Sequence, residues 1–272
     1  MSSNLVFLLI FAVAASASTE FPQDLIIAVH ADNKGIINET QKLVDTQIDG
    51  RIVGGFDSQP GQFPYLVSFR VNNQHICGGS IVNQNNILTA AHCVEAAASN
   101  INDATIVTGT VFLNQGGNSN KVISMYYYTN YPGYLDFGVV RVSGSIDYNN
   151  YQQPIPLATN RPPGNSRAVT SGWGLTSTPP GSVPNGQQYL YVNIIDTEQC
   201  RSVYSDITTE ICTLNAVNQG VCSGDSGGPL VYNGQLVAVT SRAVLCAKGY
   251  PDIFGSVPNN MDNILRLINS SF

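Results

Sequence analysis

Short runs of hydrophobic and β-branched residues alternate with polar turns along most of the chain after residue 52. Clusters of Gly, Asn and Pro separate these runs, which is typical of the short strands of a sandwich or barrel. The pattern predicts one helix, at 260–268, because Ile264, Leu265 and Ile268 recur on one face. It predicts strands at 65–71, 80–82, 87–89, 105–108, 121–123, 138–142, 168–170, 189–192 and 236–240.

Two stretches depart from this pattern. Residues 147–167 are rich in Pro, Asn and Gln without periodicity, and we interpret them as the connection between two halves of the fold. Residues 5–15 form an apolar run that ends in small residues, and it is shorter than the roughly 20 residues that cross a bilayer. This run predicts a secretory signal peptide over residues 1–17, and hence a secreted, extracellular protein without a membrane span.

Composition and charge narrow the class of protein. A hydrophobic content of 43% with only 11% charged residues is typical of a packed globular protein. The formal net charge is −6, and the 12 Lys and Arg residues are scattered. Neither nucleic acid nor an anionic membrane is therefore expected as a partner.

Six cysteines agree with a secreted protein, since an even number in such a chain predicts three disulfides. The count alone allows 15 pairings. Zinc binding is the alternative, but the closely spaced Cys and His pairs of zinc sites are missing. The cysteines are Cys77, Cys93, Cys200, Cys212, Cys222 and Cys246.

Residues 18–51 form a segment without cysteine that contains a glycosylation sequon at Asn38. The sequence then changes abruptly to Arg51-Ile52-Val53-Gly54-Gly55. A single Arg at such a boundary predicts a processing site, and an ordinary linker into a first strand is the alternative. A second sequon begins at Asn269.

Three polar landmarks suggest chemistry. Ser226 lies among glycines in Gly224-Asp225-Ser226-Gly227-Gly228, where a tight turn could aim backbone N–H groups at an oxyanion. A Gly-rich surface turn is the alternative. His92 adjoins a cysteine, and Asp136 lies in the apolar stretch 134–140, where a buried carboxylate needs a partner.

Together these landmarks resemble the trypsin/chymotrypsin family of serine proteases. The resemblance covers Ile52 to the C-terminus, and its details at Gly220 and at Pro251-Asp252 are similar to insect chymotrypsin-like enzymes. The matching motifs occur in the family's order: 51–55, 89–93, Asp136, 171–174 and 224–229.

The resemblance implies an all-β fold of two packed antiparallel Greek-key β-barrels, at about 52–146 and 167–258, with a short C-terminal helix. The whole protease domain would span 52–272, after a signal peptide at 1–17 and an activation propeptide at 18–51. The active site would lie in the cleft between the barrels. The implied disulfides are Cys77–Cys93, Cys200–Cys212 and Cys222–Cys246.

The resemblance also implies roles for the three landmarks. His92 would accept the proton of the Ser226 hydroxyl, and Asp136 would orient the imidazole. The backbone N–H groups of Gly224 and Ser226 would form the oxyanion hole.

Activation follows from the same resemblance. Cleavage after Arg51 would free the α-amine of Ile52, which would pair with Asp225 and order the oxyanion loop. His75 matches a position that in some precursors of the family holds this aspartate in an inactive arrangement, and a packed structural histidine is the alternative.

The substrate pocket would be lined by Gly220, Ser241, Ala243 and Asp252. Gly220 occupies the floor position where trypsins have Asp, which favours a hydrophobic, chymotrypsin-like pocket. Asp252 could also accept a basic side chain and broaden the specificity, or it could face away toward the backbone. Arg242 replaces the usual aromatic residue of the family. Its charge would favour acidic substrate residues, and a solvent-facing side chain is the alternative.

We therefore expect a secreted serine endopeptidase, made as a zymogen and used in digestion. No cofactor or metal is expected, because no Asp or Glu occurs between Asp103 and Asp136, where the family's calcium loop lies. Expected partners are protein or peptide substrates, a trypsin-like activating protease and protein inhibitors, with the enzyme as a monomer. The alternatives are a non-catalytic homologue that binds protein and a regulatory protease of narrow specificity, although the pro-segment lacks the cysteine typical of the latter.

Overall fold

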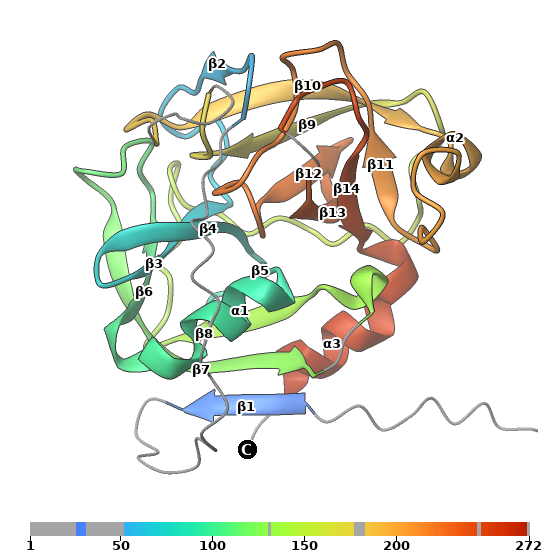
Figure 1. The fold of residues 1–272 in the computed structure, drawn as a ribbon. Helices are drawn as coiled ribbons and strands as arrows, with labels where there is room; N and C mark the ends of the chain where they lie inside the picture. The colour runs from blue at the N-terminus through green and yellow to red at the C-terminus, as the bar shows by residue number, and fades with distance from the viewer. Residues whose placement is uncertain (1–25, 31–51, 130–131, 177–182, 244–245, 271–272) are drawn as a thin grey trace, which may run out of the picture.

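The structure is a computed structural model that describes residues 26–30, 52–129, 132–176, 183–243 and 246–270. Two antiparallel sheets form separate halves of the molecule (Figure 1). The predicted signal peptide, Asn38 and Arg51 lie outside the described residues. Within the described part of the chain, the longest helices are too short and too polar to span a bilayer.

The first sheet has the strand order β1-β7-β6-β3-β4-β5-β8, and pairing of β7 with β8 closes six of its strands into a barrel. β1 lies outside this ring and pairs only with β7. The strands are β1 (Ile26–His30), β3 (Leu66–Val71), β4 (Gln74–Ile81), β5 (Asn86–Thr89), β6 (Ala104–Thr108), β7 (Asn118–Tyr128) and β8 (Gly138–Val142).

The second sheet has the order β11-β14-β13-β12-β9-β10-β2, and pairing of β11 with β10 closes a second six-stranded barrel. The two-barrel prediction is confirmed. The strands are β2 (Phe56–Asp57), β9 (Arg167–Gly172), β10 (Gln188–Ile195), β11 (Ile211–Thr213), β12 (Pro229–Tyr232), β13 (Gln235–Arg242) and β14 (Asp252–Ser256).

The prediction of a single helix was wrong. The C-terminal helix is present as α3 (Met261–Asn269), but two short helices precede it, α1 (Ala91–Ala97) and α2 (Thr197–Arg201). Helices of 7 and 5 residues span at most two turns, so they carry little periodic signal. Short 3₁₀ turns add η1 (Ala98–Asp103), η2 (Gly133–Leu135) and η3 (Pro258–Asn260).

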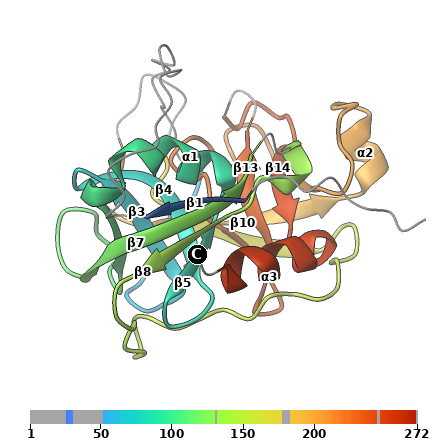
Figure 2. The ribbon, with the colours of Figure 1, turned by 90° about the horizontal axis from the view of Figure 1, so that it is seen from below.

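Helix α3 returns from the second barrel to pack beside β8 of the first (Figure 2). Ile264 and Leu267 are fully buried there, whereas Leu265, predicted on the buried face, is 42% exposed. The helix is also held by side chains of the first barrel, since Arg141 donates a hydrogen bond to the Ile268 carbonyl at 2.9 Å. The C-terminal helix therefore joins the two halves.

The three disulfides have the pairing that the family resemblance implies: Cys77–Cys93, Cys200–Cys212 and Cys222–Cys246. The Cys77–Cys93 disulfide joins β4 to α1, and the Cys200–Cys212 disulfide joins α2 to β11.

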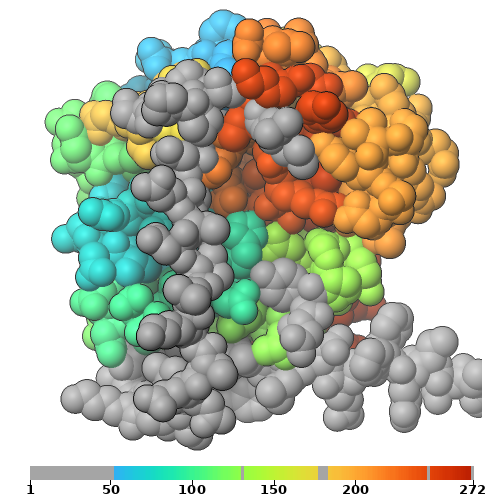
Figure 3. All heavy atoms as spheres, viewed as in Figure 1, coloured from blue at the N-terminus to red at the C-terminus, as the bar shows by residue number. Residues whose placement is uncertain are grey.

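The first and second halves of the chain meet across the face shown in Figure 3. Residues carried by loops of both halves can thus meet at this junction.

Candidate active site

His92 is positioned by the close packing of α1 against β8. The helix begins directly after β5, and Val94 and Ala90 face the first residue of β8, Gly138. A Cβ atom at Gly138 would lie 2.5 Å from Val94 Cγ2 and 3.0 Å from the Ala90 carbonyl oxygen. Only glycine therefore allows the helix that carries His92 to lie at this distance from the strand.

Asp136 stands between η2 and β8, and three groups of the protein converge on its carboxylate. Oδ2 lies 2.8 Å from His92 Nδ1 and accepts a hydrogen bond from Ser241 Oγ at 2.6 Å. Oδ1 accepts a hydrogen bond from the His92 backbone N–H at 3.1 Å. Phe137 next to it is fully buried, with its ring packed on Gly255 of β14. Packing between the two barrels thus fixes the carboxylate.

The pKa values of His92 and Asp136 shift in opposite directions. Burial alone would lower the pKa of His92, but the hydrogen bond and charge of Asp136, with the charge of Glu95, raise it above its usual value. Burial alone would raise the pKa of Asp136, but bonds from His92 and Ser241 lower it. An ionised carboxylate beside an imidazole that readily takes up a proton is the arrangement that a general base requires.

Ser226 lies in a turn that needs glycine on both sides. Gly224 has φ +84° and Gly227 φ +75°, and a Cβ at Gly227 would lie 2.7 Å from the Gly78 carbonyl oxygen. The Ser226 carbonyl accepts a hydrogen bond from the Gly78 N–H of β4 at 2.8 Å. The serine, although it belongs to the second half of the chain, is therefore tied to the first barrel.

His92 and Ser226 line the same cavity of about 200 Å³, together with Val71, Ile76 and the Cys77–Cys93 disulfide. Among the residues that the structure describes, no hydrogen bond joins the His92 ring to the Ser226 hydroxyl. Such bonds are often loose without substrate. His92 also lies near the sulfurs of Cys77 and Cys93, but both are in a disulfide and cannot ligate a metal as thiolates.

His75 forms a hydrogen bond to the turn that contains Ser226. Its Nε2 donates a hydrogen bond to the Gly224 carbonyl at 3.0 Å, and its Nδ1 accepts one from Ser68 Oγ at 2.9 Å. Burial lowers the pKa of His75 to about 4, so the ring is neutral and can make both bonds. The hypothesis that His75 holds Asp225 does not describe this structure, in which its partners are Gly224 and Ser68.

Asp225 is fully buried and accepts hydrogen bonds from the N–H groups of Gly174 at 2.8 Å and Cys222 at 3.2 Å. Burial raises its pKa well above the usual range, against the effect of these two bonds. Ile52 is also fully buried, in the core of the second barrel with Val221. Next to it, the Val53 N–H donates to the Gly220 carbonyl at 2.8 Å.

At the predicted pocket, Asp252 of β14 lies against Gly220. A Cβ atom at Gly220 would be 2.6 Å from Asp252 Oδ2, so the two positions cannot both carry large side chains. The same oxygen accepts a hydrogen bond from the Val221 N–H at 2.9 Å. The carboxylate is thus bound to backbone while it lies next to Gly220. Burial raises its pKa to about 7, partly offset by this bond.

The other predicted pocket residues differ in what they contact. Ala243 is half-buried against the core of the second barrel. The hydroxyl of Ser241, a residue expected to line the pocket, donates a hydrogen bond to Asp136. Arg242 forms an ion pair with Asp206 at 2.5 Å, so its charge is already partnered.

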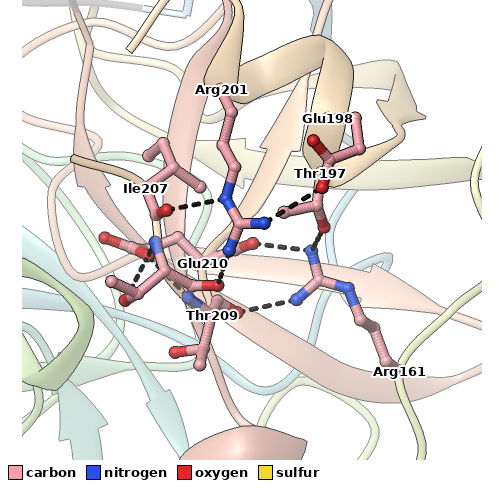
Figure 4. Close-up of polar contacts among 8 residues, drawn as sticks. Arg161, Thr197, Glu198, Arg201, Ile207, Thr209 and Glu210 are labelled. Atoms are coloured by element: carbon pink, nitrogen blue, oxygen red, sulfur yellow. Dashed lines mark hydrogen bonds and ion pairs between the residues drawn. The ribbon is translucent and has the colours of Figure 1, made fainter. Parts of the chain in front are cut away.

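The loop that supplies Asp206 is held by two arginines that the sequence did not single out (Figure 4). Arg161 donates hydrogen bonds to the carbonyls of Thr209 at 2.7 Å and Glu210 at 2.6 Å. Arg201 donates to the Ile207 carbonyl at 3.0 Å. Arg161 belongs to the connection between the barrels, where composition did not single out any side chain.

Comparisons with known proteins show the family of the chain. The family model described as Trypsin matches residues 52–264. Trypsin delta of Drosophila erecta is 38% identical over 222 residues, which cover 78% of this chain and 86% of that protein. Trypsin alpha of Drosophila melanogaster is 37% identical over 222 residues, with 78% and 85% covered.

A solved structure shows the same fold. The structure of mouse neuropsin, described as a serine protease expressed in the limbic system of the brain, superposes with a TM-score of 0.74 at 25% identity, covering 80% of this chain and all of that one. The fold and these relatives define a serine endopeptidase, a hydrolase whose substrates are proteins. The chain belongs to the trypsin family.

Proposed function

We propose that Ser226, His92 and Asp136 form the catalytic triad of this endopeptidase. The observation that carries the proposal is the bond of 2.8 Å between His92 Nδ1 and Asp136, with Ser226 on the same cavity as His92. Nδ1 is thereby kept protonated, so that Nε2 is the nitrogen that can accept a proton.

In the proposed reaction, Ser226 Oγ attacks the carbonyl carbon of the scissile peptide bond while His92 Nε2 takes the hydroxyl proton. The C–N bond then breaks, and the imidazolium returns the proton to the leaving amine. Water, deprotonated by His92, attacks the resulting ester, releases the acid product and restores the serine. Asp136 stabilises the imidazolium in both halves and does not itself take up the proton.

The N–H groups of Gly224 and Ser226 are proposed to bind the oxyanion of each tetrahedral intermediate. The positive φ of Gly224 and the hydrogen bond that His75 donates to its carbonyl support this role, because both restrain the backbone that links the two donor N–H groups. Loss of one such donor typically costs about 3–4 kcal/mol of transition-state stabilisation.

We infer that the protein is a secreted zymogen, with a signal peptide at 1–17, a propeptide at 18–51 and a protease domain at 52–272. A trypsin-like protease would cleave after Arg51. The freed Ile52 amine is the cation that would stabilise the fully buried Asp225, which accepts hydrogen bonds from two backbone N–H groups of the described residues.

Gly220 and Asp252 support a broad primary specificity. A neutral Asp252 leaves a mainly apolar pocket for aromatic or Leu side chains, and an ionised one offers a carboxylate to Lys or Arg. Digestion of dietary protein is the setting that we propose for such a broad endopeptidase, with protein inhibitors as its natural regulators.

The test is to cleave the purified precursor after Arg51 and to measure hydrolysis of peptides with Phe, Leu, Ala, Arg or Lys before the scissile bond. We expect activity only after cleavage, on apolar and basic residues, with Ser226→Ala as the silent control. Hydrolysis of Arg and Lys peptides alone would contradict the pocket assignment. A cleaved protein that binds peptides without hydrolysing any would instead be the non-catalytic homologue.

A further inference from the structure

Strand β1 lies in the segment that cleavage after Arg51 would separate from the protease domain. It pairs with β7 in antiparallel register over five residues, from Ile26 opposite Tyr128 to His30 opposite Ser124. Figures 1 and 2 show it along β7 at the end of the first barrel that lies farthest from the second sheet. Nothing in the catalytic arrangement uses this contact.

The two edges of β7 have different neighbours along its length. Residues 118–121 pair with β6, and residues 122–127 pair with β8. Beyond the end of β6, residues 124–128 have β1 as their second neighbour. Without β1, this stretch of β7 would therefore lose its second strand neighbour and become an edge of the sheet.

The residues on that edge lack the usual protection. The stretch Ser124-Met125-Tyr126-Tyr127-Tyr128 contains no charge and no Pro, and its tyrosines favour strands. Natural edge strands are commonly guarded by Lys, Pro or a cover, because an open edge is a template for pairing with another chain. Lys121, the charged residue of β7, lies in the half that β6 already covers.

We propose that the pro-segment strand Ile26–His30 is a removable cover of this β7 edge, held only while the pro-segment remains joined to the domain. Its sequence, Ile-Ile-Ala-Val-His, is itself strand-forming. The cover fits the edge through backbone hydrogen bonds, which place few demands on the side chains.

The covalent link between β1 and the protease domain explains why cleavage would release the cover. Five residue pairs make few hydrogen bonds, each of small net value in water, and a free peptide loses its translational freedom on binding. In the uncut chain, residues 31–51 keep the strand at an effective concentration in the millimolar range. The pro-segment has no cysteine that could retain it after cleavage. This step rests on the proposed activation at Arg51.

The test is amide hydrogen exchange of residues 124–128 in precursor carrying Ser226→Ala, which removes self-digestion. We expect the amides facing β1 to exchange about tenfold or more faster after cleavage and removal of the free pro-segment. Residues 118–121, covered by β6, are the internal control and should not change. Equal exchange of 124–128 before and after would overturn the proposal.

Two proline variants test the cover without any cleavage. Neighbouring N–H groups of a strand point to opposite sides, so only one of Ile27 and Ala28 donates toward β7. We therefore expect one of Ile27→Pro and Ala28→Pro to speed exchange at 124–128 in the uncut precursor and the other to leave it nearly unchanged. If neither variant changes exchange at 124–128, the proposal that β1 covers this edge is wrong, even if the protease itself proves active.

Discussion

At the residue scale, the carboxylate of Asp136 depends on contributions from both halves of the chain. His92 comes from α1 of the first barrel, and Ser241 comes from β13 of the second, yet both bond the same oxygen. The sequence identified Asp136 because a carboxylate in an apolar stretch needs a partner. It gave no indication that Ser241 is one of those partners, since its contact arises only when the barrels pack.

Asp136→Asn should nearly abolish turnover while leaving the fold intact. An amide at this position would favour the wrong imidazole tautomer, and the same change in Ser-His-Asp triads lowers kcat by about 10⁴-fold. Single-turnover kinetics of the cleaved enzyme measure this loss. Asp262→Asn, at an exposed position of α3, is the matched control and should have full activity.

Asp252 should make the preference for basic substrates depend on pH. Burial raises its pKa to about 7 from an ordinary value near 3.8, so the carboxyl is neutral below neutral pH and charged above it. The ratio of kcat/KM for an Arg peptide to that for a Phe peptide should therefore rise as pH increases through about 7. The ratio cancels the titration of His92, which acts on both substrates.

The charge of Asp252 acts on two other ionisable groups, since it contributes to the raised pKa values of the fully buried Asp225 and of the Tyr204 phenol. Tyr204 stays neutral in this pH range because burial raises its pKa. In Asp252→Asn the ratio of kcat/KM for the Arg peptide to that for the Phe peptide should be low and should not change with pH. A ratio that still rises in this variant would assign the titration to another group.

At the scale of elements, α1 shows what the hydrophobic pattern could not predict. The Thr-Ala-Ala-His-Cys motif marked His92, but seven residues are too few for a helical period to emerge. The strands were easier to predict than the short helices. Runs of β-branched residues, such as those of β3, β8 and β13, lie in the barrel cores and are recognisable in the sequence. β11, β12 and β14 are short and went unpredicted.

Gly138→Ala should disturb helix α1, which carries His92. Its new Cβ would lie 2.5 Å from Val94 Cγ2, and overpacking of this kind costs about 1–3 kcal/mol. We expect a lower melting temperature and a reduced kcat, since α1 must move away from β8 and carry His92 with it. Gly186→Ala is the matched control, because its nearest neighbour would be at 4.0 Å and no effect is expected. Unchanged stability in Gly138→Ala would contradict this account of the packing.

At the scale of the whole molecule, the two barrels and the three disulfides follow from the family resemblance that the motifs carry, and the C-terminal helix follows from its hydrophobic periodicity. The activation site itself lies outside the described residues. The loop tied by Arg161 and Glu210 and the strand β1 could not be predicted, since both depend on contacts between segments far apart in sequence. Of the two interpretations that the sequence left open for His75, this structure agrees with the packed structural histidine, because Gly224 and Ser68 bond its two ring nitrogens.

The most direct measurement is covalent labelling of the cleaved enzyme with an organophosphonate, followed by peptide mapping. We predict one label, on Ser226, formed quickly by the parent enzyme and very slowly by His92→Ala. A label on any other residue, or proteolysis that survives Ser226→Ala, would contradict the assignment of the active site.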